Sequence, residues 1–487
     1  MKATDIYISS SLNPNQITSG TLSYAMGAGR PVISTPFLHA KEILNDSVGR
    51  FARFKSSSSF SRAIIELLSD DNLRKEMGRI AYAETRKMTW HNVAKSYMNI
   101  FNEKVPITEK YSKILPKIKL GHLQKLTDSF GIIQFSKNTK PDIESGYTLD
   151  DNARALAFCC DYLSTKNDES VFKLLEKYFD FVKYTQSDDG NFYNLVDKNK
   201  VVDKEDWSSD AFGRAIWALG VLFSSKNVPE EIRFKASKMI EKAAPIFSKV
   251  ESSKSIAFIL IGLCEYNKTL NSQEVTNTIS SLADILVKEY KENSSSGWDW
   301  FQSYLTYSNG RQSEALFKAY AETKNQDYLD VAVSTTDFLI STTFQNEMFC
   351  PVGHDGWYHK SGKRAHFDQQ PVDACSMIDL LIDAYQATKK EKYFENAYVA
   401  FDWFLGNNET GCAVYDELSG GCHDGLGSAT INLNEGAEST ISYLSARLRI
   451  KHAKELVKKK GFPSEKEIVL NKDLVSIKET VSHNLKQ

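Results

Sequence analysis

The segments that join the predicted helices of this chain alternate between very short and very long through residues 118–450. Two or three residues separate helices at 165–167, 226–228, 269–271, 324–325 and 388–390, whereas long segments separate them at 187–207, 293–310, 343–370 and 407–434. Apolar spacing places the helices at 118–129, 149–164, 168–186, 208–225, 229–249, 253–268, 272–292, 311–323, 326–342, 371–387, 391–406 and 435–450. Because short links join antiparallel neighbours, twelve such helices predict six hairpins in a ring, an all-α (α/α)6 toroid.

All four long segments are expected on one face of this ring, because alternate links of antiparallel helices lie at opposite ends. The helices that follow the long segments should form the inner ring. Polar residues cluster where these helices begin, at 150–154, 206–214, 298–314, 366–373 and 434–438. This face is identified from the lengths of the segments alone. Binding and catalytic residues commonly lie on loops that a rigid scaffold holds in place. The clusters therefore favour a functional site there.

Carboxylates, amides and tryptophans recur in these clusters. Tryptophan rings stack on sugar C–H faces, Asp, Asn and Gln bind hydroxyls, and two separated carboxylates can act as general acid and as base or nucleophile. Asp368 and Asp151 are the predicted acid/base pair, with Asp150, Asp373 and Glu435 as substitutes. The predicted substrate-binding residues are Trp207, Asp210, Trp298, Asp299, Trp300, Asn309, Arg311, Trp357, His366, Gln369, Gln370, Asn434 and Glu438.

Each cluster also has a structural explanation. An Asp at a helix start, such as Asp150, commonly caps the helix. Glu435 and Glu438 lie where an acidic side chain stabilises the helix dipole. Five clusters at equivalent positions of one face are better explained by a shared site. Trp217 and Trp403 fall on helices away from this face and are expected in the core.

The first 105 residues have a different pattern, in which short apolar strands at 5–9 and 31–35 alternate with helical stretches at 21–28, 59–69 and 72–87. This alternation predicts a small parallel α/β unit. The predicted organisation is therefore multidomain: an α/β segment at 1–105, a linker at 106–119, the toroid at 120–455 and a polar tail at 456–487.

The run ITSGTLSYAMGAGRPVISTP, followed by HAKEIL and by MTW at 88–90, resembles the end of the donor-binding domain of GT-B glycosyltransferases of the retaining group 1/4 families. The resemblance implies that Ser19, Gly20 and Thr21 begin a helix that faces the donor diphosphate, as an anion at a helix N-terminus would. The family's paired glutamates fall on Gln16 and Tyr24. The printed sequence also lacks the second Rossmann-like domain, so the segment is expected either to bind a donor or to pack as a relic.

The runs GYTLDDNARAL, DAFGRAIWALG, GWDWFQSYLTYSNGRQSEAL, FDQQPVDA and NLNEGAEST resemble a bacterial family of six-hairpin-glycosidase-like domains over about residues 120–450. Such domains often occur fused to, or beside, group 1/4 glycosyltransferases. The resemblance implies sugar chemistry without naming a reaction. In relatives, Glu often stands at the position of Gln302 and Gln at that of Glu435.

Net charge, apolar run length and motif spacing argue against several classes of partner and cofactor. A net charge of −2 argues against nucleic acid and anionic membranes. The longest apolar run, 256–264, is too short to span a bilayer, and the opening residues do not form a signal peptide. Seven cysteines without a CxxC pair indicate reduced thiols in a cytoplasmic protein. No metal-ligand or P-loop spacing occurs, so neither a metal nor a cofactor is predicted.

Three functions fit these features. The first is a glycoside hydrolase-like enzyme that acts on an oligosaccharide or glycoconjugate. The second is a glycosyltransferase, or one subunit of it, which uses a nucleotide sugar and obtains its other half from a separate glycosyltransferase chain. The third is a non-catalytic glycan-binding scaffold. A sugar epimerase would need a histidine pair, for which the long-segment face offers His354, His359, His366 and His423.

Overall fold

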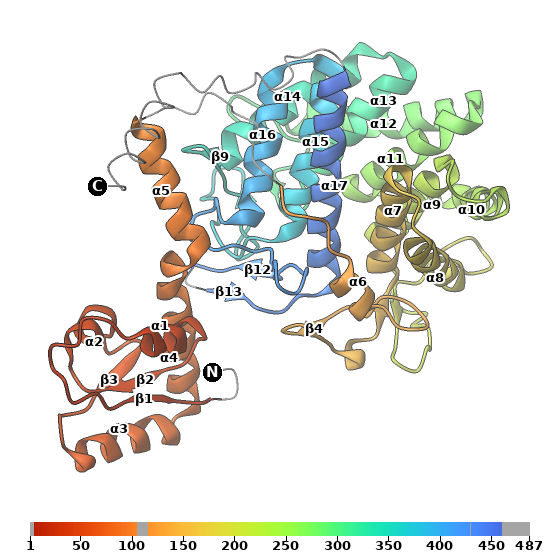
Figure 1. Cartoon of the computed structure of the whole chain (residues 1–487). Coiled ribbons are helices and arrows are strands. Elements are labelled where there is room, and N and C mark those ends of the chain that lie inside the picture. The colour runs from red at the N-terminus through yellow and green to blue at the C-terminus, as the bar shows by residue number, and fades with distance from the viewer. Residues whose placement is uncertain (1–3, 105–114, 429, 460–487) are drawn as a thin grey trace, which may run out of the picture.

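Most of the chain forms a closed ring of helices (Figure 1). The computed structural model describes residues 4–104, 115–428 and 430–459. Six inner helices each pack against the next, and the last packs back against the first. They are α7 (Leu149–Thr165), α9 (Ser209–Ser224), α11 (Ser253–Leu270), α13 (Gly310–Thr323), α15 (Pro371–Thr388) and α17 (Ala437–Lys459). These are the helices predicted to be inner, and the toroid is confirmed.

An outer helix packs against each inner one. Five of them are α8 (Glu169–Thr185), α10 (Glu230–Ala243), α12 (Gln273–Asn293), α14 (Gln326–Thr343) and α16 (Glu391–Asp402). The sixth position is taken by α6 (Gly121–Leu126), which packs against α17 and is half the length predicted for it. The 3-10 turns η3 (Ala244–Lys249) and η4 (Trp403–Leu405) end two of the predicted outer helices.

The long segments lie together at one end of the ring, at the bottom of Figure 1. The segments at this end contain short antiparallel strand pairs. These are β4 (Ser136–Lys137) with β5 (Lys140–Pro141), β6 (Tyr147–Thr148) with β7 (Leu195–Val196), β8 (Tyr304–Leu305) with β11 (Tyr358–His359), β9 (Phe344–Gln345) with β10 (Met348–Phe349), and β12 (Gly425–Leu426) with β13 (Ile431–Asn432). The pairs β6–β7 and β8–β11 join different segments, and the others are hairpins within one segment. Because β8 and β11 come from different long segments, this end is one connected surface.

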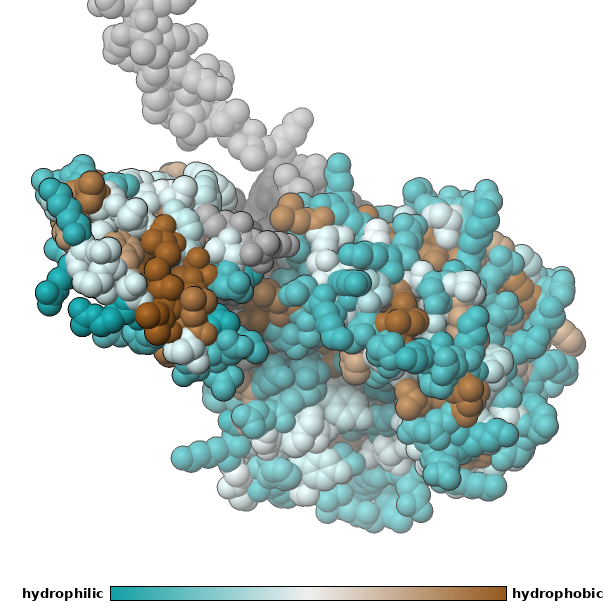
Figure 2. All heavy atoms as spheres, turned by 90° about the horizontal axis from the view of Figure 1, so that it is seen from below, coloured by the Kyte–Doolittle hydropathy of each residue, from teal (hydrophilic) through white to brown (hydrophobic). Residues whose placement is uncertain are grey.

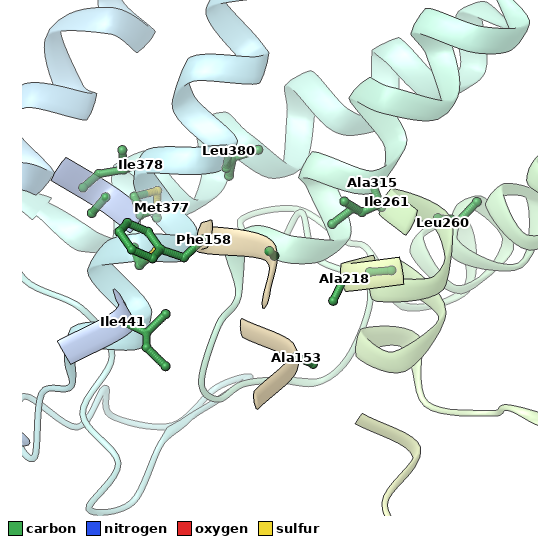
Figure 3. Close-up of a cluster of buried hydrophobic side chains, with 14 of the residues drawn as sticks. Ala153, Phe158, Ala218, Leu260, Ile261, Ala315, Met377, Ile378, Leu380 and Ile441 are labelled. Atoms are coloured by element: carbon green, nitrogen blue, oxygen red, sulfur yellow. The ribbon is translucent and has the colours of Figure 1, made fainter. Parts of the chain in front are cut away.

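Local sequence explains where the inner helices begin and why they are central. The side chains of Thr148, Ser208 and Ser252 accept backbone N–H groups at the starts of α7, α9 and α11, as N-cap residues do. The middle of α11 is buried all round, as expected for a helix with neighbours on every side. Small and branched side chains of the inner helices pack together in Figure 3.

Two glycines allow α9 and α11 to approach closely. A Cβ atom on Gly262 of α11 would lie 2.5 Å from the carbonyl oxygen of Ile216, and one on Gly220 of α9 would lie 2.1 Å from that of Gly262. These distances are far below van der Waals contact, and both neighbouring atoms are backbone. The two helices therefore depend on glycine at this crossing.

Replacing Gly262 with Ala is expected to lower the free energy of unfolding by about 1–3 kcal/mol, because the clash outweighs the gain of about 1 kcal/mol in helix propensity. Urea unfolding followed by circular dichroism measures the change. Gly121 is the matched control, since a Cβ atom there meets nothing within 4 Å. Gly121→Ala should be neutral or slightly stabilising, and equal loss in both variants would contradict the packing argument.

Residues 4–104 form a small α/β unit. Its strands β1 (Tyr7–Ser9), β2 (Val32–Ser34) and β3 (Gly49–Phe51) are parallel, in the order β1-β2-β3. Its helices are α1 (Gly20–Gly27), α2 (Leu38–Ile43), α3 (Ser57–Ser69), α4 (Asp71–Thr85) and α5 (Trp90–Lys104), with the 3-10 turn η1 (Arg86–Met88) between the last two. The predicted strands and helices are present in the described residues, and β3, α2 and α5 are additional.

This unit contacts the long segment that precedes α17. The side-chain amide of Asn92 donates to the carbonyl oxygen of Gly411 at 2.6 Å, and Arg79 reaches the Thr430 hydroxyl at 3.3 Å. Tyr82 packs against the toroid core. Figure 2 shows an apolar patch on the unit, which has several exposed apolar residues. Most of the predicted linker, and the tail beyond Lys459, lie outside the described residues.

Candidate active site

Arg154 lies near the start of α7, at the end of the ring where the long segments gather. Its guanidinium pairs with Glu438 of α17 and lies 3.5 Å from carboxylate oxygens of Asp150 and Asp151. Those two residues precede Arg154 by one helical turn, so all three share a face of α7. Arg154 is buried, and water therefore screens these charges little.

Arg214 of α9 joins the second inner helix to this cluster. Its Nε lies 3.0 Å from Asp150, and its guanidinium lies 4.5 Å above the Phe258 ring of α11. Asp150 therefore bridges two arginines. Burial alone would raise the pKa of Glu438, but the Arg154 and Arg214 charges outweigh burial and lower it. Burial and the charge of Asp150 raise the pKa of Asp151.

Asp210 of α9 accepts hydrogen bonds from the Tyr307 hydroxyl and, at 2.6 Å, from the Ser255 hydroxyl. The buried ammonium of Lys254, at the start of α11, lies 3.9 Å above the Tyr307 ring. Burial lowers the pKa of Lys254 to about 8, against the opposing charges of Asp210 and Asp373. A lysine in this state can exchange a proton near neutral pH.

Asp373 of α15 anchors the aromatic wall of the site. It accepts the Ser308 backbone N–H at 2.6 Å and lies 3.0 Å from Nε2 of His354. The His354 ring packs against the Trp357 ring, with centroids 4.4 Å apart. Trp357 is half-buried, with a left-handed backbone conformation (φ 59°). Such conformations cost energy and cluster at functional sites.

Asp368 and Asp424 lie at the rim, on different long segments. Asp368 is exposed, yet partial desolvation raises its pKa against the opposing effect of His354. Burial also raises the pKa of Asp424, and the charges of Glu438 and Asp368 add to this rise. A Cβ atom on Gly425 would lie 2.8 Å from Oδ1 of Asp368, so glycine leaves room for this carboxylate.

The structure therefore gathers seven predicted residues at one mouth. They are Asp150, Asp151, Asp210, Trp357, Asp368, Asp373 and Glu438. The surface at this end is largely hydrophilic (Figure 2). Lys254 is a member of the site that the sequence did not indicate, because only a short link precedes its helix and an isolated lysine resembles any surface lysine.

Trp298 and Trp300 are not available for stacking on a sugar, contrary to the prediction. They are 4% and 0% exposed. Trp298 donates its indole N–H to the carbonyl oxygen of Gln302 and packs edge-on against Phe338 and Tyr358. The long segment folds back over the outer helices, so its tryptophans join the core.

Glu435 and Asn434 also lie away from the mouth. Helix α17 begins at Ala437, two residues later than predicted, and Glu435 turns into a buried pocket. There its Oε2 accepts from Ser419 at 2.7 Å and lies 3.6 Å from Nε2 of His122. Asn434 accepts the backbone N–H of Asn138 and fixes the β4–β5 hairpin.

Burial raises the pKa of Glu435 to about 7, whereas burial lowers the pKa of His122 and of His423. The contribution of Glu435 to stability is therefore complete below its unfolded pKa near 4.5 and is lost as the pH rises to about 7. Glu435→Gln should remove this loss. Above pH 7 we expect the variant to be more stable than the wild type by roughly 2–3 kcal/mol, and near pH 4 the two should be alike. Urea unfolding at both pH values measures this, and a difference that is independent of pH would contradict it.

Four predicted binding residues instead stabilise loops or line another hollow. The Gln369 amide is buried and binds the Trp403 indole N–H and Glu409. Asn309 is buried and bonds twice to Thr306. Asp299 and His366 line a shallow hollow of about 710 Å³ beside α14. These polar residues stabilise the long segments, which have little regular structure of their own.

The remaining predicted residues are less central. Trp207 is 45% exposed and donates its indole N–H to Asn191, so it lies on the surface of a long segment. Gln370 immediately precedes α15, makes no capping hydrogen bond with its side chain, and bonds to Asp368. Arg311 is buried deeper in the ring, where it pairs with Glu314 and Asp379. In the α/β unit, Ser19 precedes α1, and Gly20 and Thr21 are its first residues.

Within the described residues, no group of three or more His, Cys, Asp or Glu side chains is placed to hold a metal ion. No described helix is both long and apolar enough to cross a membrane. All seven cysteines are buried and free.

No protein-family model and no curated protein sequence matches the chain. Solved structures do resemble its fold. Cellobiose 2-epimerase from Bacillus thermoamylovorans B4167 is 11% identical, with a TM-score of 0.56 over 74% of this chain and 100% of that one. A D-mannose isomerase is 14% identical, with a TM-score of 0.54 over 69% and 94%. A family 76 α-mannanase from Bacteroides thetaiotaomicron is 12% identical, with a TM-score of 0.50 over 77% and 99%. At these identities the likeness establishes the toroid fold alone.

Proposed function

We propose that the chain is a carbohydrate-active enzyme whose toroid acts on an oligosaccharide or glycoconjugate by carboxylate acid/base glycoside chemistry. The observation that supports this most directly is the convergence of carboxylates from α7, α9, α15 and α17 on one open mouth beside Trp357. Buried arginines hold several of these carboxylates in fixed positions. Such a preorganised arrangement is what protonation and displacement at a glycosidic bond require.

Asp368 is the proposed general acid. It is exposed, so a substrate can reach it, and its raised pKa favours the protonated form that an acid needs. Asp150 is the proposed base or nucleophile in place of Asp151. Asp151 is buried and accepts the Thr148 hydroxyl at 2.8 Å, whereas Asp150 is 25% exposed and held by Arg154 and Arg214.

The fold supports the same chemical class. The epimerase, isomerase and mannanase named above process sugars, and each shares this toroid. Ligand sites of globular proteins contain a few convergent polar groups, and the mouth brings such groups together beside Trp357. A screen against reducing-end-labelled oligosaccharides, analysed for shortened products, tests the proposal. Absence of any cleavage across α- and β-linked neutral glycans would count against it.

Sugar epimerisation is the alternative outcome of that screen. Epimerases of this fold would need a pair of proton-transferring histidines, and among the described residues only His354 contacts the Asp373–Trp357 wall. His359 is exposed beside Tyr304, and His423 is buried beside Glu435. Incorporation of deuterium from heavy water into an unshortened sugar would identify this activity. Binding without any product would instead favour a glycan-binding scaffold.

Trp357→Ala is expected to raise KM by about tenfold, which corresponds to the loss of one aromatic contact, with a smaller change in kcat. Initial-rate kinetics on the cleaved glycan measure both constants. Trp207→Ala is the matched control, because Trp207 is also a partly exposed tryptophan of a long segment but lies against Asn191. Equal effects of the two substitutions would remove Trp357 from the proposed sugar site.

A second candidate function concerns residues 1–105, proposed here as a partial GT-B donor domain joined to the toroid at 120–455. It is favoured by the parallel order β1-β2-β3 and by the start of α1, where the Ser19 side chain makes no capping hydrogen bond. A diphosphate could bind these N–H groups. Titration with UDP-sugars by calorimetry tests this, and no binding, with or without a partner chain, would exclude it.

The buried free cysteines support a cytoplasmic location.

A further inference from the structure

A cavity inside the ring extends from the first turns of α13 and α15, next to the mouth, to the opposite end of the ring. It has a volume of about 570 Å³ and is lined by all six inner helices. Arg154, Arg214 and Ser308 bound it on the side of the mouth, and it extends to Lys226 and Asn227 at a short link. The two arginines therefore line this cavity, here called the basal cavity, and also pair with the mouth carboxylates.

A network of buried ion pairs frames the basal cavity. Arg311 pairs with Glu314 at 2.6 Å and with Asp379 at 2.9 Å. Lys318 lies 3.1 Å from Glu265 and 3.0 Å from Asp383. Each cation therefore bridges carboxylates from two directions, one on its own or a preceding helix and one on α15. A cation that pairs with two carboxylates is held rigidly. The cavity between these ion pairs is therefore expected to keep its shape.

A third cation completes the frame from the last helix. Arg449 of α17 pairs with Asp383 and lies 3.6 Å from Asp379. Burying this many charges costs free energy that apolar residues of similar volume would not cost. An apolar core would serve the ring better if stability were its sole purpose. Stability alone therefore does not account for the charged lining.

The lining also includes hydroxyls, amides, apolar side chains and one indole ring. Ser442 and Ser445 of α17 and Gln386 of α15 line the cavity. Trp217, expected in the core, lines it as well, beside the Phe258 ring and 5.5 Å from the Arg311 guanidinium. Hydrogen-bonding groups of both polarities next to an aromatic ring suit a compact ligand with many hydroxyl groups.

We propose that the basal cavity is a second binding site, separate from the mouth, for a small polyhydroxylated ligand of monosaccharide size. Its volume falls within the range of about 300–1,000 Å³ usual for ligand sites. Seven Lys and Arg side chains and five Asp and Glu side chains line it. Two of these cations, Arg154 and Arg214, are already paired with the mouth carboxylates. The remaining five cations equal the five carboxylates in number, which favours a neutral sugar.

Calorimetry on the full chain tests this with D-glucose, D-glucuronate and D-glucose 6-phosphate, each at up to about 10 mM, since single small sugars bind with dissociation constants near the millimolar range. We expect binding of at least one of the three, with glucose bound at least as tightly as either acidic sugar. Asp368→Asn, at the mouth, should leave this binding unchanged. Absence of binding by all three probes would overturn the proposal.

Ser445→Tyr places a large side chain in the basal cavity and should weaken that binding by at least about tenfold, because it occupies ligand volume. Ser281→Tyr is the matched control, since Ser281 is exposed on the outer helix α12. Trp217→Leu is a second variant that removes the ring and keeps an apolar side chain. Circular dichroism confirms the fold of each. Unchanged binding in both cavity variants would assign the sugar to another place and overturn the proposal.

Discussion

Replacing Asp368 with Asn is expected to reduce turnover by a factor of about 10²–10⁴, the usual contribution of a general acid. Asn has nearly the same shape as Asp and can keep the contact with Gln370, but it has no proton to give to a leaving group. Asp368 is exposed at the rim, so the melting temperature should stay within a degree or two of the wild-type value. Product formation under saturating substrate and a thermal melt measure the two quantities.

Asp299→Asn is the control for this result. Asp299 is also a partly exposed aspartate of a long segment, but it lines the shallow hollow beside α14 and not the mouth. Its replacement should leave turnover within about twofold of wild type, as surface substitutions generally do. Full activity in Asp368→Asn would remove Asp368 from the chemistry and leave Asp424 as the rim carboxylate to examine.

Arg154→Met is expected to destabilise the fold by about 3–5 kcal/mol, because removing one partner of a buried ion pair leaves uncompensated charge. Here three carboxylates, Asp150, Asp151 and Glu438, lose a common cation. Met is similar in length to Arg and fills much of the same space. The loss of free energy of unfolding should therefore come from the missing charge more than from lost packing. Urea unfolding at pH 7 measures the loss.

The pH dependence of this variant distinguishes charge from packing. Without Arg154 the three carboxylates should take up protons in the folded state more readily than in the unfolded state. The deficit should therefore shrink as the pH falls from 7 to 5. Lys173→Met removes an exposed partner of Glu169 and should cost no more than about 1 kcal/mol. A deficit in Arg154→Met that does not change with pH would assign the effect to packing.

The toroid could be predicted from the lengths of the links between helices. Short links join the two helices of a hairpin at one end of the ring, and long links join neighbouring hairpins at the other. The same argument located the mouth before any side chain was considered. Asp150, Asp210, Asp373 and Glu438 followed from it, since each lies in the first turn of an inner helix. The position of these residues within a helix was enough to place them at the mouth, because the first turn of every inner helix lies at that end of the ring.

Residues of the long segments could not be placed in this way. Trp300 and Gln369 have the composition of a sugar site, but whether such residues face the mouth or the core depends on how each segment folds back. Glu435 was misplaced by a two-residue difference in where α17 begins. Arg311 shares the first turns of α13 with Glu314, and the pair turns inward because Asp379 of α15 lies opposite. In each case, contacts with residues distant in the sequence determine where the side chain lies.

The closure of the ring has a consequence for how the protein is made. Helix α17 is the last described element of the chain, yet it packs against α7, one of the first in the toroid, and Glu438 supplies the closest carboxylate to Arg154. During synthesis the first five inner helices emerge while Arg154 still lacks this partner. The mouth cannot reach its final charge balance until the ribosome has released α17. A nascent chain is therefore an open arc in which the charge cluster of the mouth is incomplete, and a toroid truncated before Ala437 should depend on chaperones for its solubility.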